Sequence, residues 1–103
     1  MIRSFLRQVY SELTSLWFNA SNVTIIYSGY DATYSYTVLQ DEWFSIYIEA
    51  GSGSSVVLKL NGITVDGVDG DNHRHLIPLK AGTIVSFDQA GSTGHAAMLA
   101  ALY

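Results

Sequence analysis

The sequence predicts a mostly β chain, an antiparallel jelly-roll β-sandwich with a short N-terminal α-helix, that assembles as a homotrimer. Three observations lead to this prediction. Hydrophobic residues recur with a helical period only in residues 1–18, and from residue 23 onward the period becomes two. Seven or eight short segments rich in β-branched and aromatic residues follow, separated by turn-forming residues. The last segment, residues 95–103, is apolar on both faces and therefore needs cover on two sides.

Composition favours an oligomer and excludes two classes of partner. Only 14% of the 103 residues are charged, whereas 49% are hydrophobic, and a typical domain carries about a quarter charged residues. The net charge of −4 with five Lys and Arg argues against nucleic-acid partners, which are held by clustered cations. No apolar run approaches the length of a membrane span, so we expect no membrane insertion. The predicted organisation is a helix (1–18), a linker (19–22) and a β-sandwich head (23–103).

The N-terminal helix is predicted from apolar residues spaced four, three, four and three apart. The stripe consists of Ile2, Leu6, Val9, Leu13 and Leu16. Leu at the a positions with Ile, Val and Leu at the d positions favours three or four strands in a coiled coil. We therefore expect a trimeric stalk. The same stripe also suits a helix that packs on its own β-domain, and this alternative stays open.

The predicted strands alternate with recognisable turns. They cover residues 23–28, 33–39, 42–50, 56–60, 63–65, 73–79, 83–87 and 95–103. Asn61-Gly62 between two β-runs is a strong hairpin signal, because both central residues need positive φ. Pro78 is expected at a sheet edge or a strand end, because proline cannot donate to a strand ladder.

The C-terminal segment is predicted to be a central strand near a threefold axis. Its alanines permit close approach of another copy, and both of its faces are apolar. A terminal helix is the alternative, since Ala, Leu and Met are good helix formers. Together with the helix stripe, the predicted trimer-interface residues are Met98, Leu99, Ala100 and Leu102.

Three stretches of strand and turn sequence then point to a family. They are Tyr-Thr-Val-Leu-Gln-Asp-Glu-Trp-Phe at 36–44, Val-Leu-Lys-Leu-Asn-Gly at 57–62 and Ile-Pro-Leu-Lys-Ala-Gly-Thr-Ile-Val at 77–85. This arrangement resembles the trimeric β-sandwich heads of tailed-bacteriophage fibres, which are similar in architecture to tumour-necrosis-factor and complement globular heads. The resemblance covers residues 34–103. It implies a non-enzymatic fibre or tip protein on the virion exterior that contacts other virion proteins and binds a glycan or an outer-membrane protein of the host.

Receptor binding is expected at loops rich in tyrosine and acidic residues. Loops at 29–31, 51–55, 66–72 and 89–94 are expected at the ends of the sandwich, where recognition normally resides. The predicted receptor-binding residues are Tyr30, Asp31, Tyr34, Asp69, Asp71 and Asn72. The seven tyrosines of the chain suit such contacts, because a tyrosine ring supplies flat contact area and its hydroxyl a hydrogen bond. A location of these tyrosines at the subunit interface is the alternative.

Catalysis is not predicted. The chain has no cysteine and no Gly-x-Ser-x-Gly nucleophile motif. Asp41 and Glu42 lie in a predicted loop, where solvation is the ordinary role of carboxylates. Two alternatives to the fibre head remain. One is a structural capsid- or tail-attached decoration protein whose helix docks on another virion protein. The other is a small lectin or hydrolase.

No resident cofactor is predicted, but two metal sites are considered. His73 and His75 point to the same side of a strand, and three chains around an axis would present six imidazoles to a transition metal. This His-x-His pair resembles the iron-binding motif of some phage fibre and spike tips. Surface histidines without a metal are the alternative. Asp66, Asp69 and Asp71 carry the oxygen ligands that Ca²⁺ prefers, whereas His95 is expected to cap a turn or contact a neighbouring subunit.

Overall fold

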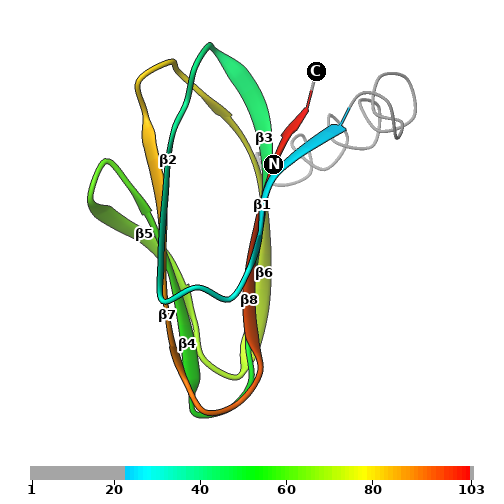
Figure 1. Cartoon of the computed structure of the whole chain (residues 1–103), viewed down its shortest axis with the longest axis vertical. Helices are drawn as coiled ribbons and strands as arrows, with labels where there is room; N and C mark the ends of the chain where they lie inside the picture. The colour runs from blue at the N-terminus through cyan, green and yellow to red at the C-terminus, as the bar shows by residue number, and fades with distance from the viewer. Residues whose placement is uncertain (1–22, 103) are drawn as a thin grey trace, which may run out of the picture.

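The computed structural model describes residues 23–102, which form two four-stranded antiparallel sheets packed face to face (Figure 1). The strands are β1 (Val23–Gly29), β2 (Thr33–Thr37), β3 (Glu42–Ala50), β4 (Ser54–Leu60), β5 (Ile63–Val68), β6 (Asp71–Leu79), β7 (Ile84–Gly91) and β8 (His95–Leu102). One sheet has the order β1-β8-β3-β6 and the other β2-β7-β4-β5. The predicted antiparallel sandwich is therefore confirmed.

The strand order is that of a jelly roll. The sandwich pairs β1 with β8, β2 with β7, β3 with β6 and β4 with β5, as when a long antiparallel ribbon wraps around a core. No helix among residues 23–102 is long and apolar enough to cross a membrane. The predicted helix, the linker and the interface residues Ile2, Leu6, Val9, Leu13 and Leu16 lie outside the described residues. The homotrimer stays a prediction.

The core lies between the two sheets and is built by alternation along the strands. Every second residue of β3 and of β7 points inward, and the others point outward. The largest fully buried side chains include Phe44, Ile46, Ile48, Phe87 and Leu99. Because these residues come from both sheets, their packing holds the sheets together.

Several strand bounds differ from the prediction. The sequence assigned residues 66–72 to a loop, but β5 continues through Val68 and β6 begins at Asp71. Similarly, β7 continues to Gly91. The glycines and aspartates that indicated loops are accommodated at sheet edges and strand ends, so short turns replace the long loops. The Asn61-Gly62 hairpin is confirmed, with φ of 52° and 79° at its two central residues.

The strand connections fall at two ends of the sandwich. Because neighbouring strands are antiparallel, the β1–β2, β3–β4, β5–β6 and β7–β8 turns lie at one end. We call this the four-loop end; it consists of residues 30–32, 51–53, 69–70 and 92–94. The described chain enters at Val23 and leaves at Leu102 at the opposite end, where these two residues pair (Figure 1).

Strand β8 is central in its sheet, between β1 and β3, as predicted, and it is a strand rather than the alternative helix. Ala97, Leu99 and Ala101 point into the core. Leu99 is 0% exposed within its own chain, whereas the sequence assigned it to the trimer interface. Met98, Ala100 and Leu102 lie on the outer face, but the predicted interface residues Ala100 and Leu102 are only 3% and 7% exposed within their own chain.

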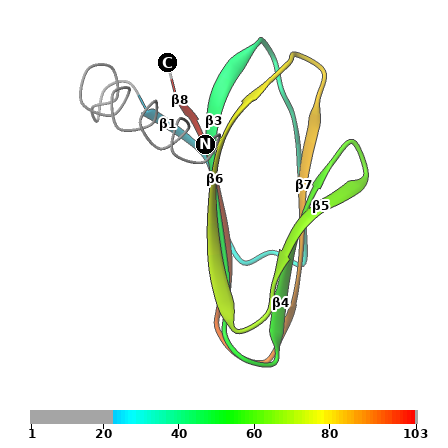
Figure 2. The ribbon, with the colours of Figure 1, turned by 180° about the vertical axis from the view of Figure 1, so that it is seen from behind.

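Two pairs of strands form the open edges of the sandwich. Figure 1 looks toward the edge with β1 and β2, and Figure 2 toward the opposite edge with β5 and β6. At the first edge the rings of Tyr27 and Tyr34 stack at 3.9 Å, and both lie near Phe87. This stack connects the sheets where no backbone hydrogen bond joins them.

Gly91 is predicted to be essential for the close approach of β4 and β7. Its φ is 124°, and a Cβ at this position would lie 2.4 Å from Cα of Ser54. Gly91→Ala would combine left-handed backbone strain with a backbone clash, so the free energy of unfolding should fall by about 3 kcal/mol. Urea unfolding measures this loss. Gly94→Ala is the control, because nothing lies within 4 Å of its added Cβ, and equal losses in the two variants would contradict the prediction.

Candidate functional site

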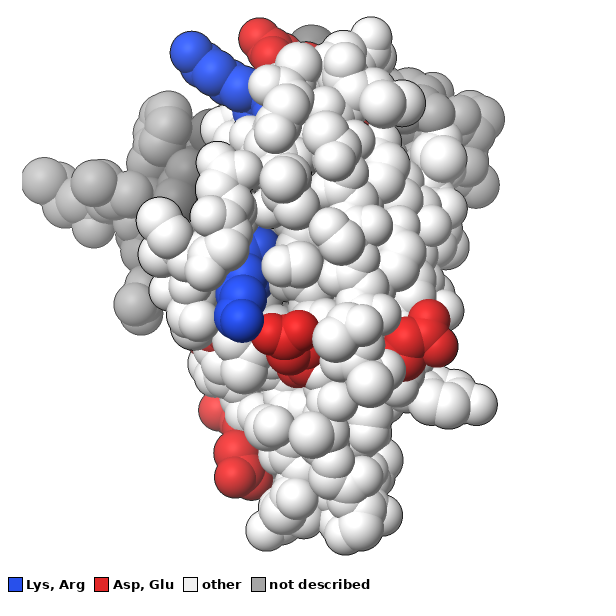
Figure 3. Space-filling model, turned by 60° about the vertical axis from the view of Figure 1, so that its left-hand side comes forward, with Lys and Arg blue, Asp and Glu red and all other residues white. Residues whose placement is uncertain are grey.

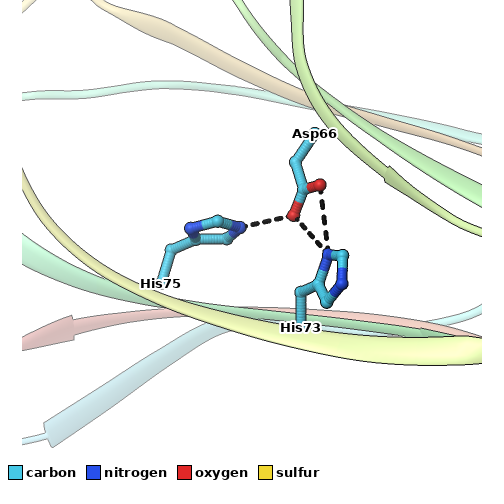
Figure 4. A group of neighbouring side chains, drawn as sticks. All are labelled: Asp66, His73 and His75. Carbon is cyan, nitrogen blue, oxygen red and sulfur yellow. Dashed lines mark hydrogen bonds and ion pairs between the residues drawn. The ribbon is translucent and has the colours of Figure 1, made fainter. Parts of the chain in front are cut away.

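A carboxylate and two imidazoles converge at the edge formed by β5 and β6 (Figure 4). Oδ2 of Asp66 lies 2.9 Å from Nδ1 of His73 and 2.5 Å from Nε2 of His75. The ligand atoms of the three side chains all lie within 4.8 Å of one another. Among residues 23–102 this is the group of His, Asp and Glu side chains close enough to hold one metal ion.

The two histidines share a face because they are two residues apart in β6. In the β3–β6 ladder, His73 is opposite Ile48 and His75 is opposite Ile46. Residues directly opposite on antiparallel strands point to the same side, so both imidazoles point inward with these core isoleucines. Because β6 is an edge strand, the rings remain about 40% exposed.

Asp66 reaches the histidines because of an irregularity in β5. The register shifts between Leu58 and Lys59 of β4, so that Leu58 is opposite Asp66 and Lys59 is opposite Thr64. Val65 is thus the extra residue of a β-bulge, and such bulges re-aim neighbouring side chains. Val65 is 51% exposed, whereas the Asp66 side chain points inward and is only 17% exposed.

The cluster is electrostatically coupled. Burial raises the pKa of Asp66, but hydrogen bonds from His75, His73 and the Gly67 N–H outweigh it, so the pKa of this carboxyl lies below its usual value. The hydrogen bond to Asp66 raises the pKa of His73, and the charges of Asp66 and Asp71 raise it further against the opposing effect of burial. The cluster therefore favours an ionised carboxylate and a protonated His73 when no other cation is present.

The three predicted calcium-binding aspartates do not form one site. Asp66 faces the histidines, whereas Oδ1 of Asp69 accepts the N–H of Gly53 at 3.2 Å. Oδ2 of Asp71 lies 3.4 Å from Nε2 of His73, on the opposite side of the ring from Asp66. Asp66 therefore contacts both histidines of the predicted pair. The three aspartates of the predicted calcium site instead make separate contacts.

The four predicted recognition loops meet at the four-loop end. Gly51 N–H donates to the Gly94 carbonyl at 2.7 Å, and Ser54 Oγ donates to the Thr93 carbonyl at 2.9 Å. Gln89 Nε2 donates to the Gly29 carbonyl at 3.2 Å. These bonds tie the β1–β2 and β3–β4 turns to the β7–β8 region, so the loops form one connected surface.

An open hollow of about 600 Å³ lies at this end. Its lining includes Glu49, Asp71, Asn72 and His95. His95 Nδ1 lies 2.9 Å from Oε1 of the buried Gln89. The sequence placed Gln89 in the predicted recognition loop 89–94, but the local pattern does not show that this side chain is buried and contacts both Gly29 and His95.

The predicted receptor-binding residues have different environments. Tyr30 is 76% exposed, and the adjacent Asp31 donates its backbone N–H to the Tyr27 hydroxyl. Asp71 and Asn72 line the hollow. Tyr34 instead points inward, in the stack with Tyr27, where burial raises its pKa.

Charged side chains are few and scattered on the face shown in Figure 3, which carries no cluster of Lys and Arg. One ion pair joins Lys59 to Asp88 across 2.8 Å. A nucleic-acid surface requires clustered cations, so this face lacks the electrostatic character of such a surface.

Comparison with known proteins leaves the family open. No protein-family model matches the chain, and no curated protein matches it. Among solved structures, the fold is similar to the C-terminal CBM6 of LamC, a marine laminarinase from Zobellia galactanivorans. The identity is 11% and the TM-score 0.44, over 87% of this chain and 95% of that chain. A likeness of this size carries no inference about function.

The Asp66 charge is predicted to determine the pKa of His73. In metal-free buffer, Asp66→Asn should lower the His73 pKa toward 6.5, which an NMR titration of the imidazole measures. Asp69→Asn is the control, because the Asp69 carboxylate contacts Gly53 instead. An unchanged pKa in Asp66→Asn would contradict the assigned coupling.

The same coupling makes stability depend on pH. Because the pKa of His73 is raised in the folded state, its protonation adds to the free energy of unfolding. This stabilisation is complete below pH 6.5 and is lost as the pH rises through the folded-state pKa. Because the pKa of Asp66 is lowered in the folded state, its ionised carboxylate also stabilises the fold. This stabilisation is present above pH 3.8 and is lost as the pH falls through the folded-state pKa. The parent protein should therefore exceed Asp66→Asn in stability most strongly between pH 3.8 and 6.5, and a pH-independent difference would contradict this.

Proposed function

We propose that this chain is the non-enzymatic, homotrimeric head of a bacteriophage fibre or tip, exposed on the virion exterior, which binds a glycan or an outer-membrane protein of the host. The observation that carries the proposal is the division of the sandwich into two ends. Four turns lie at one end. Hydrogen bonds join the β3–β4, β5–β6 and β7–β8 turns to one another, and Gln89 of β7 bonds to the β1–β2 connection. The described chain enters at Val23 at the other end. An attachment segment before Val23 would therefore leave the four-loop end free to face a receptor.

The four-loop end suits recognition in its chemistry as well as its position. A rigid sandwich supports loops that carry exposed polar and aromatic groups, as binding surfaces commonly require. Tyr30, in the β1–β2 turn, is 76% exposed, and the β3–β4, β5–β6 and β7–β8 turns at the same end line a hollow with Asp71 and Asn72 in its wall. Three copies of a weak site on one head would bind a repetitive host surface with higher avidity than one copy.

A homotrimer is supported by the outer face of the β1-β8-β3-β6 sheet. We call the following residues the outer apolar patch: Ile25, Trp43, Leu76, Pro78, Met98, Ala100 and Leu102. The strand registers place them together on the side away from the core. Ile25 is 61% exposed, so this part of the patch is open to a further copy of the chain, whereas Ala100 and Leu102 are only 3% and 7% exposed within their own chain. The same face carries Tyr47, Glu49 and Arg74 nearer the four-loop end, so a contact between copies would lie on the part of the face away from that end.

The environment of the histidines supports a binding rather than a catalytic role. In the described part of the chain, His73 and His75 contact Asp66, and His95 contacts Gln89. None of these partners is a hydroxyl or a thiol, so the contacts do not assemble the Ser–His or Cys–His pair of a hydrolase.

Light scattering tests the oligomer. The full chain should have the mass of three copies, and Met98→Glu should dissociate it because a charge would be placed in the outer apolar patch. Ile84→Glu is the matched control, since Ile84 is an apolar residue, 42% exposed, on the outer face of the other sheet. Circular dichroism verifies that both variants are folded. A monomeric full-length chain, or equal dissociation by both variants, would contradict the trimer assigned to this face.

Binding of the purified protein to a glycan array and to bacterial cells tests the receptor role. Tyr30→Ala should weaken binding at least about tenfold, because an exposed aromatic anchor is lost. Leu39→Ala is the control, since Leu39 is 81% exposed at the opposite end of the sandwich. A chain that binds no glycan and no cell but assembles onto other virion proteins would instead be a decoration protein.

A further inference from the structure

We propose that Asp66, His73 and His75 form a site for one divalent transition-metal ion in each chain, with zinc-type coordination. The site is independent of the proposed host-binding function. The supporting observation is the convergence of two imidazole nitrogens on one carboxylate oxygen, with all ligand atoms within 4.8 Å. Two nitrogens and one oxygen are the ligands of borderline ions such as Zn²⁺ and Co²⁺.

The spacing of the donor atoms fits such an ion after a small adjustment. A tetrahedral Zn²⁺ with bonds near 2.1 Å holds its ligand atoms about 3.4 Å apart. Oδ2 of Asp66 now lies 2.9 Å from His73 Nδ1 and 2.5 Å from His75 Nε2. These two oxygen–nitrogen distances would lengthen by about 0.5–0.9 Å, and the two imidazole nitrogens already lie within 4.8 Å of each other. The imidazoles are about 40% exposed, so they have room to make this movement.

The outer partners of the ligands are already in place. The Gly67 N–H donates to Oδ1 of Asp66 at 2.8 Å, which orients the carboxylate and leaves Oδ2 toward the histidines. On the far side of the His73 ring, Oδ2 of Asp71 lies 3.4 Å from Nε2. A ligating histidine commonly presents its second N–H to a carboxylate, which orients the ring for the metal. Asp71 is therefore assigned as a positioning residue for His73.

The bound ion would join the two sheets at an open edge. Asp66 belongs to β5 in one sheet, and both histidines belong to β6 in the other. Three protein ligands leave a fourth tetrahedral position for water on the solvent side. Ca²⁺ and Mg²⁺ fit this site less well, because both prefer oxygen ligands. Ca²⁺ takes more ligands than this site offers, and Mg²⁺ requires octahedral geometry.

The number of metal ions bound per chain distinguishes the proposed site from a site on a threefold axis. Six imidazoles around a threefold axis would hold one ion for every three chains. The proposed site holds one ion in each chain, because a single chain supplies all three ligands. Metal analysis of the full chain after zinc loading and gel filtration therefore distinguishes the two arrangements directly.

Isothermal titration with Zn²⁺ at pH 7.5 tests the ligands. The parent protein should bind one Zn²⁺ per chain, with a rise in the unfolding temperature. Asp66→Asn and His75→Gln should each weaken binding about 100-fold or more, and Asp71→Asn about tenfold. His95→Gln is the matched control, because it removes a histidine that contacts Gln89 and not the cluster.

Two measurements on the unaltered protein keep the test independent of how the variants fold. Co²⁺ should give the visible absorption of a tetrahedral nitrogen–oxygen site, and Zn²⁺ should shift the NMR signals of the His73 and His75 rings. One ion per three chains would overturn the proposal. So would zinc binding that Asp66→Asn leaves unchanged, or ring signals that do not respond to zinc.

Discussion

The last strand of the sandwich, β8, is apolar on both faces, and this constraint determines the arrangement of the whole sheet. A strand of this kind cannot lie at an edge or face water, so it occupies the position between β1 and β3. Its inward residues, Ala97, Leu99 and Ala101, contribute to the core. Its outward residues extend the outer apolar patch. The first and third strands must therefore be brought to either side of the last one, as the wrapped ribbon of a jelly roll does.

The sandwich has two edges at which no backbone hydrogen bonds join the sheets. At each edge, side chains of a different chemistry connect one sheet to the other. Stacked rings of Tyr27 and Tyr34 join β1 to β2, and the Asp66–histidine cluster joins β5 to β6. The aromatic contact is a stack of two rings at 3.9 Å, and burial raises the pKa of Tyr34. The ionic contact depends on protonation, and the side chains of His73 and His75 are about 40% exposed to solvent. The second edge is consequently the part of the fold that responds to its surroundings.

Sequence reasoning recovered the sandwich because its signals are local: alternation along 42–50 gave bounds identical to those of β3, and Asn61-Gly62 identified a hairpin. The candidate site was recovered in part. His73 and His75 share a face because of strand periodicity alone. Asp66 was grouped with the acidic loop because its glycine-rich surroundings indicate a turn, and its true direction depends on the bulge at Val65. A bulge follows from pairing with a distant strand, so no local pattern reveals it.

The edge strands also restrict how copies of the chain can assemble. Each carries a feature that discourages pairing with another strand. β1 contains a register shift, β2 has only five residues, β5 has a bulge beside the inward-pointing Asp66, and β6 contains Pro78 and two inward histidines. Addition of strands from another copy is thus disfavoured at all four edges. Within residues 23–102, contact between copies is therefore better suited to a sheet face than to a sheet edge, and the outer face of the β1-β8-β3-β6 sheet is the one on which strand registers gather apolar side chains.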